Sequence, residues 1–298
     1  MKPAPFSYYR PADLAEALQC LDAQPGAKVL AGGQSLLPLM NRRLVRPSHL
    51  VDISRLDELS GLSVEGDHVL VGGACIQRRV ELDARVRRSL ALLSAAISHV
   101  NHVSVRNRGT LGGSLAHADP GAEIPAVLTA LDGVVHVESR NGRRAIAASE
   151  FILAANTTVM AYNEIITAIV LPTRNASAGW GFAEVSRRHG DPAMAGAAVT
   201  VRTSRAGSLV ARCVLFGVIG RPILVEAVTD MPVSSPGIAD QPATSRAVDA
   251  IVDAIEPSLH ESDMQASDPL RWRYARSCAA KAARHALARW AASPQALR

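Results

Sequence analysis

The chain has 298 residues, of which 48% are hydrophobic and 20% are charged, and its formal net charge is +5. This composition excludes a disordered chain, which would have too few apolar residues to form a core, and it excludes a collagen-like repeat. No apolar run approaches the roughly 20 residues that a membrane-spanning helix needs. The first residues lack the apolar segment of a secretion signal, so we expect a cytoplasmic protein. The basic excess is mild and dispersed, which argues against a nucleic-acid-binding protein.

Four cysteines, Cys20, Cys75, Cys213 and Cys278, are spread over the whole chain. Their spacing excludes a CxxC zinc site and the clustered thiolates of an iron–sulfur centre. The sequence therefore predicts that they are small buried hydrophobic residues.

The first part of the chain mixes helices with short strands. Leu14, Ala17, Leu18 and Leu21 recur at helical spacing, and the strand that follows runs into Gly32-Gly33. This β-α-β start predicts parallel pairing of the first strands. We predict helices at 11–21, 80–99 and 124–131, strands at 28–31, 50–53, 68–72 and 164–171, and hairpin strands at 134–138 and 143–146 around Asn141-Gly142.

A polar, turn-rich segment at 172–179 marks the best domain boundary. Beyond it we predict strands at 180–185, 196–202 and 209–218, a loop at 232–242, and helices at 245–255 and 268–290. The predicted fold class is α+β, in two parts.

Two glycine segments are the strongest candidates for a binding site. Residues 31–36 (AGGQSL) directly follow a predicted strand, and residues 109–115 (GTLGGSL) follow a basic stretch. Paired glycines let the backbone approach a ligand, and successive N–H groups can then bind an anion such as a diphosphate. Neither segment matches GxGxxG or GxxxxGK[ST], which disfavours a Rossmann site or a P-loop. Taken alone, each glycine pair is better explained as a tight turn, and the two pairs together make the turn and the ligand site equally good explanations.

Longer motifs around these glycines carry a family resemblance. AGGQSLLPLM at 31–40, VRNRGTLGGSLAHADPGAEIP at 105–125 and GFAEVSRRHGDPAMAGAAV at 181–199 occur in the order typical of one family. The chain resembles the FAD-binding medium subunits of bacterial molybdenum hydroxylases, the xanthine dehydrogenase and carbon monoxide dehydrogenase flavoprotein family. The resemblance implies a vanillyl-alcohol-oxidase (PCMH-type) FAD-binding domain of two α+β subdomains at 1–175. It also implies a C-terminal domain at 176–298 made of a three-stranded antiparallel sheet with a helical bundle.

The same resemblance implies which residues contact FAD. Main-chain N–H groups of both glycine segments would hold the diphosphate and ribityl, with the hydroxyls of Thr110 and Ser114 as further donors. Glu123 matches a position where fused eukaryotic relatives have an aspartate, and Ala183 falls where those relatives have a lysine, so no lysine contact is expected. The complete set implied is Ala31, Gly32, Gly33, Gln34, Ser35, Leu36, Thr110, Leu111, Gly112, Gly113, Ser114, Glu123, Ile165 and Ile166.

Other polar residues leave alternatives open. His117 and Asp119 form an HxD pair, for which we expect a structural or hydrogen-bonding role near the flavin and no metal. His99 and His102 are expected at the end of the long helix, where cations are favoured. Residues 186–188 (SRR) are either a solvated surface or a subunit interface.

The basic C-terminal helix carries Trp272, Tyr274 and Trp290. It is either a packed helix with a solvated face or a docking element, since Trp, Tyr and Arg are the usual anchors of interfaces.

The resemblance implies an electron-transfer flavoprotein subunit. It would accept electrons from the 2Fe–2S clusters of a small subunit, in a complex whose large molybdopterin subunit hydroxylates the substrate, and pass them to an external acceptor. Such complexes would be dimers of heterotrimers, and the motifs lean weakly towards relatives that act on aromatic N-heterocycles. The alternatives are a self-sufficient flavin oxidase or dehydrogenase of the same fold, and a non-enzymatic assembly module. No catalytic nucleophile or base is predicted, because GxSxG is absent.

Overall fold

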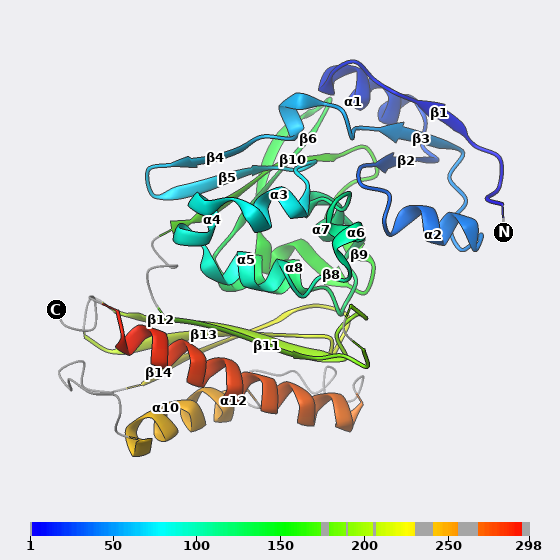
Figure 1. Cartoon of the computed structure of the whole chain (residues 1–298). Helices are drawn as coiled ribbons and strands as arrows, with labels where there is room; N and C mark the ends of the chain where they lie inside the picture. Colours follow the sequence, from blue (N-terminus) through cyan, green and yellow to red (C-terminus); the bar gives the residue numbers. More distant parts are fainter. Residues whose placement is uncertain are drawn as a thin grey trace.

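The computed structural model describes residues 2–173, 179–188, 190–204, 207–229, 241–255 and 268–293, without the side chains of 241–243. It is a mixed α+β structure, as predicted. An N-terminal lobe lies at the top of Figure 1, a central lobe lies below it, and a sheet covered by two helices lies at the bottom. Most of the predicted linker at 172–179 and loop at 232–242 falls outside the described residues. Within the described residues, no helix is long and apolar enough to cross a membrane.

The N-terminal lobe is a small parallel sheet covered by one helix. Its elements are β1 (Ser7–Tyr9), α1 (Leu14–Ala23), β2 (Ala27–Leu30), α2 (Leu36–Asn41) and β3 (His49–Asp52). The strand order is β1-β3-β2, and both pairings are parallel, which confirms the predicted β-α-β start. Helix α1 begins where the Asp13 side chain accepts the amide of Glu16, and its buried stripe is the one predicted. Strand β1 was missed, because its three exposed residues show no alternating pattern.

The central lobe is built on a five-stranded sheet. Its elements are η1 (Asp57–Leu59), β4 (Leu62–Glu65), β5 (His68–Gly72), α3 (Gln77–Leu82), α4 (Ala84–Ser89), α5 (Ala91–Ile97), α6 (Val103–Arg106), α7 (Leu111–His117), α8 (Glu123–Ala130), β6 (Val134–Ser139), β7 (Gly142–Ala147), α9 (Ala148–Phe151), β8 (Ile152–Ala154), β9 (Thr157–Thr158) and β10 (Ile165–Pro172). The order β4-β5-β10-β6-β7 is antiparallel throughout and includes the predicted hairpin at Asn141-Gly142. Strand β10 lies at the centre and joins the two hairpins.

The long helix predicted at 80–99 is wrong, because three short helices, α3, α4 and α5, occupy this region. Asp83 adopts an extended conformation and its carboxylate accepts the amides of Arg85 and Val86, so it ends one helix and starts the next. Leu90 has φ −139° and makes the second break. Of the apolar stripe predicted for this helix, Val86, Leu90, Leu93 and Ile97 are buried in one core, whereas Leu82 is wrong, since 50% of its surface is exposed.

The C-terminal part is a four-stranded antiparallel sheet with two described helices. Its elements are β11 (Gly179–Val185), β12 (Ala195–Thr203), β13 (Leu209–Phe216), β14 (Ile223–Thr229), α10 (Gln241–Asp253) and α12 (Pro269–Ala291). The expected three-stranded sheet is corrected to four strands in the order β11-β12-β13-β14. The fourth strand pairs with β13 along Ile223–Thr229, where alternating apolar residues fit a half-buried strand.

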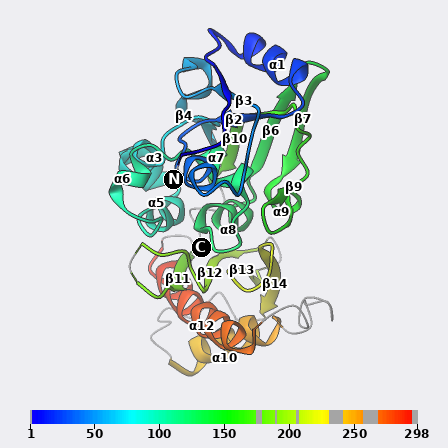
Figure 2. The same ribbon diagram turned by 90° about the vertical axis from the view of Figure 1, so that its right-hand side faces the viewer.

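The C-terminal sheet packs on both faces. One face contributes Phe182, Ala198, Val214 and Phe216 to the core of the central lobe, and the other face is covered by α12 and α10 (Figure 2). Helix α8 lies against the first face, where the Thr200 hydroxyl donates to the Ala130 carbonyl. The domain division at residue 175 stays a prediction.

Candidate functional site

The first glycine segment is a turn that leaves its amides unpaired. It links β2 to α2. Gly33 has φ +71°, a left-handed conformation that is unfavourable for residues with a side chain. Within the described residues, the amide N–H groups of residues 32–36 donate no hydrogen bond to the protein, and the Gln34 amide side chain donates to the Gly32 carbonyl. A row of partly exposed, unpaired amides is the arrangement that binds an anion.

The second glycine segment is mostly helical. Thr110 caps α7 by accepting the amide of Gly113 at 2.9 Å. The amides of Leu111, Gly112 and Ser114 donate to backbone carbonyls of the protein. The prediction that this segment offers free main-chain amides is therefore wrong for residues 111–114, because the helix and its cap already use them. Its hydroxyls at Thr110 and Ser114 remain as candidate ligand donors.

The structure brings the two segments together through glycine. A Cβ at Gly32 would lie 2.1 Å from the Arg108 carbonyl oxygen, immediately before the second segment. A Cβ at Gly112 would lie 2.4 Å from the Gly73 carbonyl oxygen. At these two positions glycine is needed for backbone-to-backbone packing.

A third glycine pair, Gly72-Gly73, was missed by the sequence reasoning. A Cβ at Gly73 would lie 1.9 Å from the Ile166 carbonyl oxygen, so this residue joins the start of α7 to β10. Ile76 forms an isolated bridge with Thr110, and the Gln77 amide donates to the Gly109 carbonyl at 2.8 Å. The signal was available, since Gly72-Gly73 ends a predicted strand as Gly32-Gly33 follows one.

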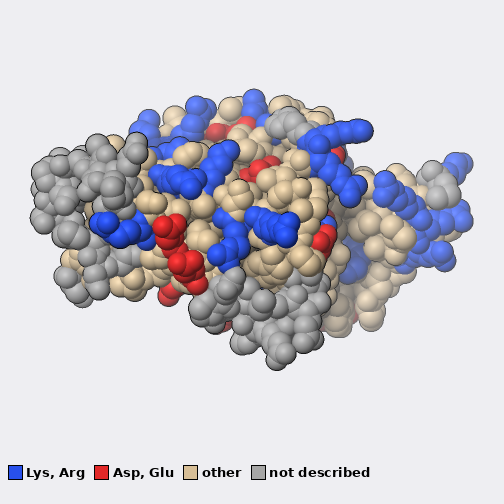
Figure 3. All heavy atoms as spheres, turned by 90° about the horizontal axis from the view of Figure 1, so that it is seen from below, with Lys and Arg blue, Asp and Glu red and all other residues tan. Residues whose placement is uncertain are grey.

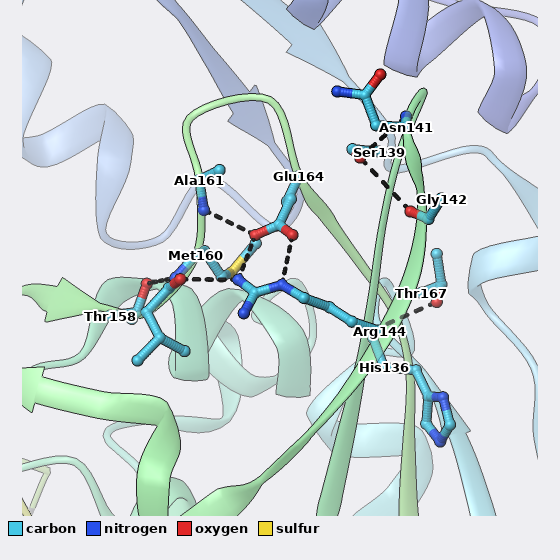
Figure 4. A network of polar contacts seen from close by, with 11 residues as sticks. His136, Ser139, Asn141, Gly142, Arg144, Thr158, Met160, Ala161, Glu164 and Thr167 are labelled. Atoms are coloured by element: carbon cyan, nitrogen blue, oxygen red, sulfur yellow. Dashed lines mark hydrogen bonds and ion pairs between the residues drawn. The ribbon is translucent and has the colours of Figure 1, made fainter.

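The two isoleucines lie at the start of β10 and are buried in different cores, Ile165 below the N-terminal lobe and Ile166 in the central lobe. The turn before them is held by the network in Figure 4. Arg144 donates to both oxygens of Glu164 at 2.7 and 2.8 Å and to the Val159 carbonyl at 2.8 Å. The hydrogen bond from Arg144 keeps the pKa of the Glu164 carboxyl below its usual value.

Glu123 is a buried carboxyl at the start of α8, with 5% of its surface exposed. Burial raises the pKa of Glu123 to about 8, and the negative charges of Glu184 and Asp119 act in the same direction. Glu123 is therefore largely protonated at neutral pH and can donate a hydrogen bond. Ala183, on β11, is buried in the C-terminal core, so no cationic side chain stands there.

The histidines have separate roles. His99 follows α5 and lies 3.2 Å from Glu184 through Nδ1, across the contact between the central lobe and the C-terminal sheet. Its ring also packs on Phe182. His102 precedes α6, and only His99 thus lies near the end of α5 as expected. His117 Nε2 lies 4.0 Å from Asp119. Within the described residues, no group of three potential metal ligands gathers.

The remaining candidates from the sequence are the cysteines and the basic residues at 186–188. Cys75, Cys213 and Cys278 are buried free thiols, and Cys20 is partly exposed. An open hollow of about 420 Å³ near Ser94 is lined by α3, α4 and α5 residues and includes neither glycine segment. Arg187 and Arg188 are exposed, which leaves both interpretations of residues 186–188 open.

The C-terminal helix packs through the residues that the sequence singled out. Trp290 is buried, while Trp272 and Tyr274 pack partly buried against the same core. The Arg289 guanidinium lies 3.7 Å from the centre of the Trp180 ring. The packed-helix interpretation is thus confirmed for its apolar face.

Comparison with known proteins identifies the family. Residues 4–174 match the family described as FAD binding domain in molybdopterin dehydrogenase. The chain is 38% identical over 221 residues to the nicotine 6-hydroxylase medium subunit of Paenarthrobacter nicotinovorans, covering 74% of this chain and 77% of that protein. It is also 38% identical over 245 residues to the caffeine dehydrogenase subunit beta of Pseudomonas sp. strain CBB1, covering 82% and 83%.

Solved structures agree along nearly the whole chain. A carbon monoxide dehydrogenase chain from Hydrogenophaga pseudoflava superposes with a TM-score of 0.82 at 32% identity, covering 97% of this chain and all of that chain. A chain of quinoline 2-oxidoreductase from Pseudomonas putida 86 gives a TM-score of 0.80 at 32% identity, with coverages of 98% and 99%. The fold, the glycine motifs and these likenesses together establish that this chain belongs to the FAD-binding medium subunits of the molybdenum hydroxylase family, as an oxidoreductase subunit whose cofactor is FAD.

Proposed function

We propose that this chain is the electron-transfer flavoprotein of a multi-subunit molybdenum hydroxylase. It would take electrons from 2Fe–2S clusters on a small subunit and pass them to an external acceptor. The observation that supports this most directly is the row of unpaired amides at residues 32–36, which fits the diphosphate of FAD. No Asp or Glu lies between Asp22 and Asp52, so no nearby carboxylate in that stretch opposes an anion.

The residues of the chain would bind and orient the cofactor. Residues 31–36 would hold the diphosphate, and the hydroxyls of Thr110 and Ser114 would add hydrogen bonds from α7. Ile165 and Ile166 would supply apolar contact at the start of β10, and protonated Glu123 would donate a hydrogen bond. Bound FAD supplies the ability to exchange electrons singly or in pairs, and the protein's part is to position and tune it.

The partners follow from the same proposal. A large molybdopterin subunit would act on the substrate, and a small subunit would hold the iron–sulfur clusters, assembled as a dimer of heterotrimers. The described residues contain no gathering of thiolates that could hold such a cluster in this chain. The names of the nicotine and caffeine relatives favour an aromatic N-heterocycle as the substrate of the complex.

The domain division and the alternative are part of the proposal. Residues 1–175 would bind FAD, and residues 176–298 would form the smaller domain that packs beneath. A self-sufficient flavin oxidase would need its own substrate site, and the lining of the open hollow beside α5 includes no residue of either glycine segment. We therefore favour the electron-transfer subunit.

The test is purification of the full chain alone. We expect yellow protein with one FAD per chain, no hydroxylase turnover, and bleaching of the flavin absorbance by a reduced 2Fe–2S ferredoxin. Turnover of an organic substrate by this chain alone would support the self-sufficient oxidase instead. Colourless protein that fails to bind added FAD would overturn the proposal.

A further inference from the structure

Unpaired cations gather on one side of the N-terminal lobe. Lys2, Arg42, Arg43 and Arg46 are exposed, and within the described residues none of them lies within ion-pair distance of a carboxylate. Leu44 stands among them with 68% of its surface exposed. We call these five residues the N-terminal basic patch. Figure 3 shows blue atoms collected at the right-hand end of the molecule, where α2 and the N-terminus lie in Figure 1.

Hydrogen bonds connect three residues of the patch, and exposed aromatic residues follow Lys2 in the chain. The Arg43 guanidinium donates to the Lys2 carbonyl at 3.2 Å, and the Arg46 guanidinium donates to the Arg43 carbonyl at 3.2 Å. The first bond ties the segment after α2 to the N-terminal residues that precede β1, and the second lies within that segment. Phe6, just before β1, and Tyr8 and Tyr9 within it expose 38%, 51% and 38% of their surfaces.

This composition is typical of a protein interface. Arginine and aromatic residues are enriched at the energetic centres of interfaces, and here the arginines stand beside an exposed leucine that can add apolar contact. A second copy of this chain would bring like charges together, which opposes association. Charge complementarity therefore favours a different protein with clustered carboxylates around an apolar contact.

The position of the patch indicates which partner it fits. Helix α2 begins at the end of the unpaired amides of residues 32–36 and ends immediately before Arg42. Its six residues span only about 9 Å at 1.5 Å per residue. A protein seated on the patch would thus lie beside the proposed FAD diphosphate site. An electron donor must approach the flavin, whereas the substrate-binding subunit has no such requirement.

We infer that the N-terminal basic patch is the docking surface for an acidic face of the iron–sulfur subunit. This inference rests on the proposed function, which requires such a subunit, and adds where it binds and by what chemistry. Leu44 supplies the apolar contact, and Arg42, Arg43, Arg46 and Lys2 supply the charges that pair with carboxylates of the partner.

The experiment compares two double variants, each of which replaces one exposed cation and one exposed leucine by acids. The test variant is Arg42→Glu with Leu44→Asp, and the control is Lys281→Glu with Leu153→Asp, which are exposed elsewhere. Each full-length chain, tagged at its C-terminus, replaces the native copy in its own organism. Iron and FAD per chain are measured after purification, and hydrogen exchange is recorded for the wild-type complex and the free chain.

We expect the test variant to lose at least tenfold in iron per chain, while the control stays within twofold of the wild type. FAD per chain should be the same in all three, and exchange at residues 2–9 and 42–49 should be slower in the complex. Unchanged iron in the test variant, or equal exchange in the patch, would overturn the inference, as would binding of the patch to anionic vesicles with iron retained. If the wild type retains iron but carries no FAD, and the test variant loses iron, the docking surface is supported and the proposed flavin function is refuted.

Discussion

Replacing Gly32 by Ala should push the two glycine segments apart. The new Cβ would lie 2.1 Å from the Arg108 carbonyl oxygen and 2.8 Å from the Gly109 Cα, whereas real Cβ contacts essentially never fall below 3.0 Å. The backbone at Gly32 or at Arg108 must therefore move by about 1 Å in a closely packed region. Forcing atoms into packed sites of this kind costs roughly 1–3 kcal/mol. For a chain of this size we expect the melting temperature to fall by about 2–4 °C per kcal/mol.

The same displacement should weaken FAD binding. If the amides of residues 32–36 hold the diphosphate, losing one charge-assisted hydrogen bond costs roughly 1.5–3 kcal/mol, or about 10–100-fold in affinity. The matched control is Gly61→Ala, because a Cβ at Gly61 meets nothing within 4 Å. Thermal unfolding of the FAD-free chains and titration with FAD measure the two effects. Equal melting temperatures and equal affinities for Gly32→Ala and Gly61→Ala would refute the reasoning.

Three further perturbations test the buried and ionised groups. The pKa of Glu123 is about 8 in the folded chain and 4.5 when unfolded. The free energy of unfolding should therefore decrease as the pH rises from 4.5 to 8, by at most about 5 kcal/mol. Glu123→Gln should therefore be more stable than the wild type at pH 9 and nearly equal at pH 4 in urea titrations; a pH-independent difference would contradict this. Arg144→Gln should cost about 1 kcal/mol at pH 7, since the pair with Glu164 is partly exposed, and this cost should disappear in acid below pH 4.5 as Glu164 becomes protonated. A thiol reagent at pH 8 should label Cys20 first and Cys213 only after unfolding, since burial raises the pKa of Cys213 to about 12; equal labelling rates by mass spectrometry would show that the burial is wrong.

Local pattern was enough to predict most elements of the fold. The stripe in α1, the hairpin at Asn141-Gly142 and the strand 165–172 all depend on residues close in sequence. The errors arose where a helix cap or the pairing of two strands overrides the local hydrophobic pattern. Asp83 breaks a helix-like apolar pattern by taking the amides of the next turn, and β1 exists only because β3 offers it a parallel edge. Neither effect is visible in hydrophobic periodicity.

The sequence singled out two glycine segments as a candidate site, but it did not show that their glycines have different roles. Gly32 of the first segment lies against Arg108 and Gly109 at the start of the second, and the shared ligand stays a prediction. Which amides are free depends on long-range acceptors: Gly112 donates to Gly73, 39 positions earlier, while residues 32–36 find no acceptor among the described residues. The sequence shows the same glycine pair in both places. Only the fold distinguishes a row of open amides from a capped helix.

That distinction changes how the second segment contributes to binding. A helix whose first amides are already used can offer hydroxyls and a bare glycine surface, but it offers few main-chain donors. Binding of an anion then depends mainly on residues 32–36, and the residues just before α7 hold that turn in place where Arg108 and Gly109 pack against Gly32. A substitution that removes only the Ser114 hydroxyl, such as Ser114→Ala, should consequently weaken FAD binding less than Gly32→Ala. If Ser114→Ala has the larger effect in the same titration, α7 is the principal ligand and the asymmetry between the two segments is wrong.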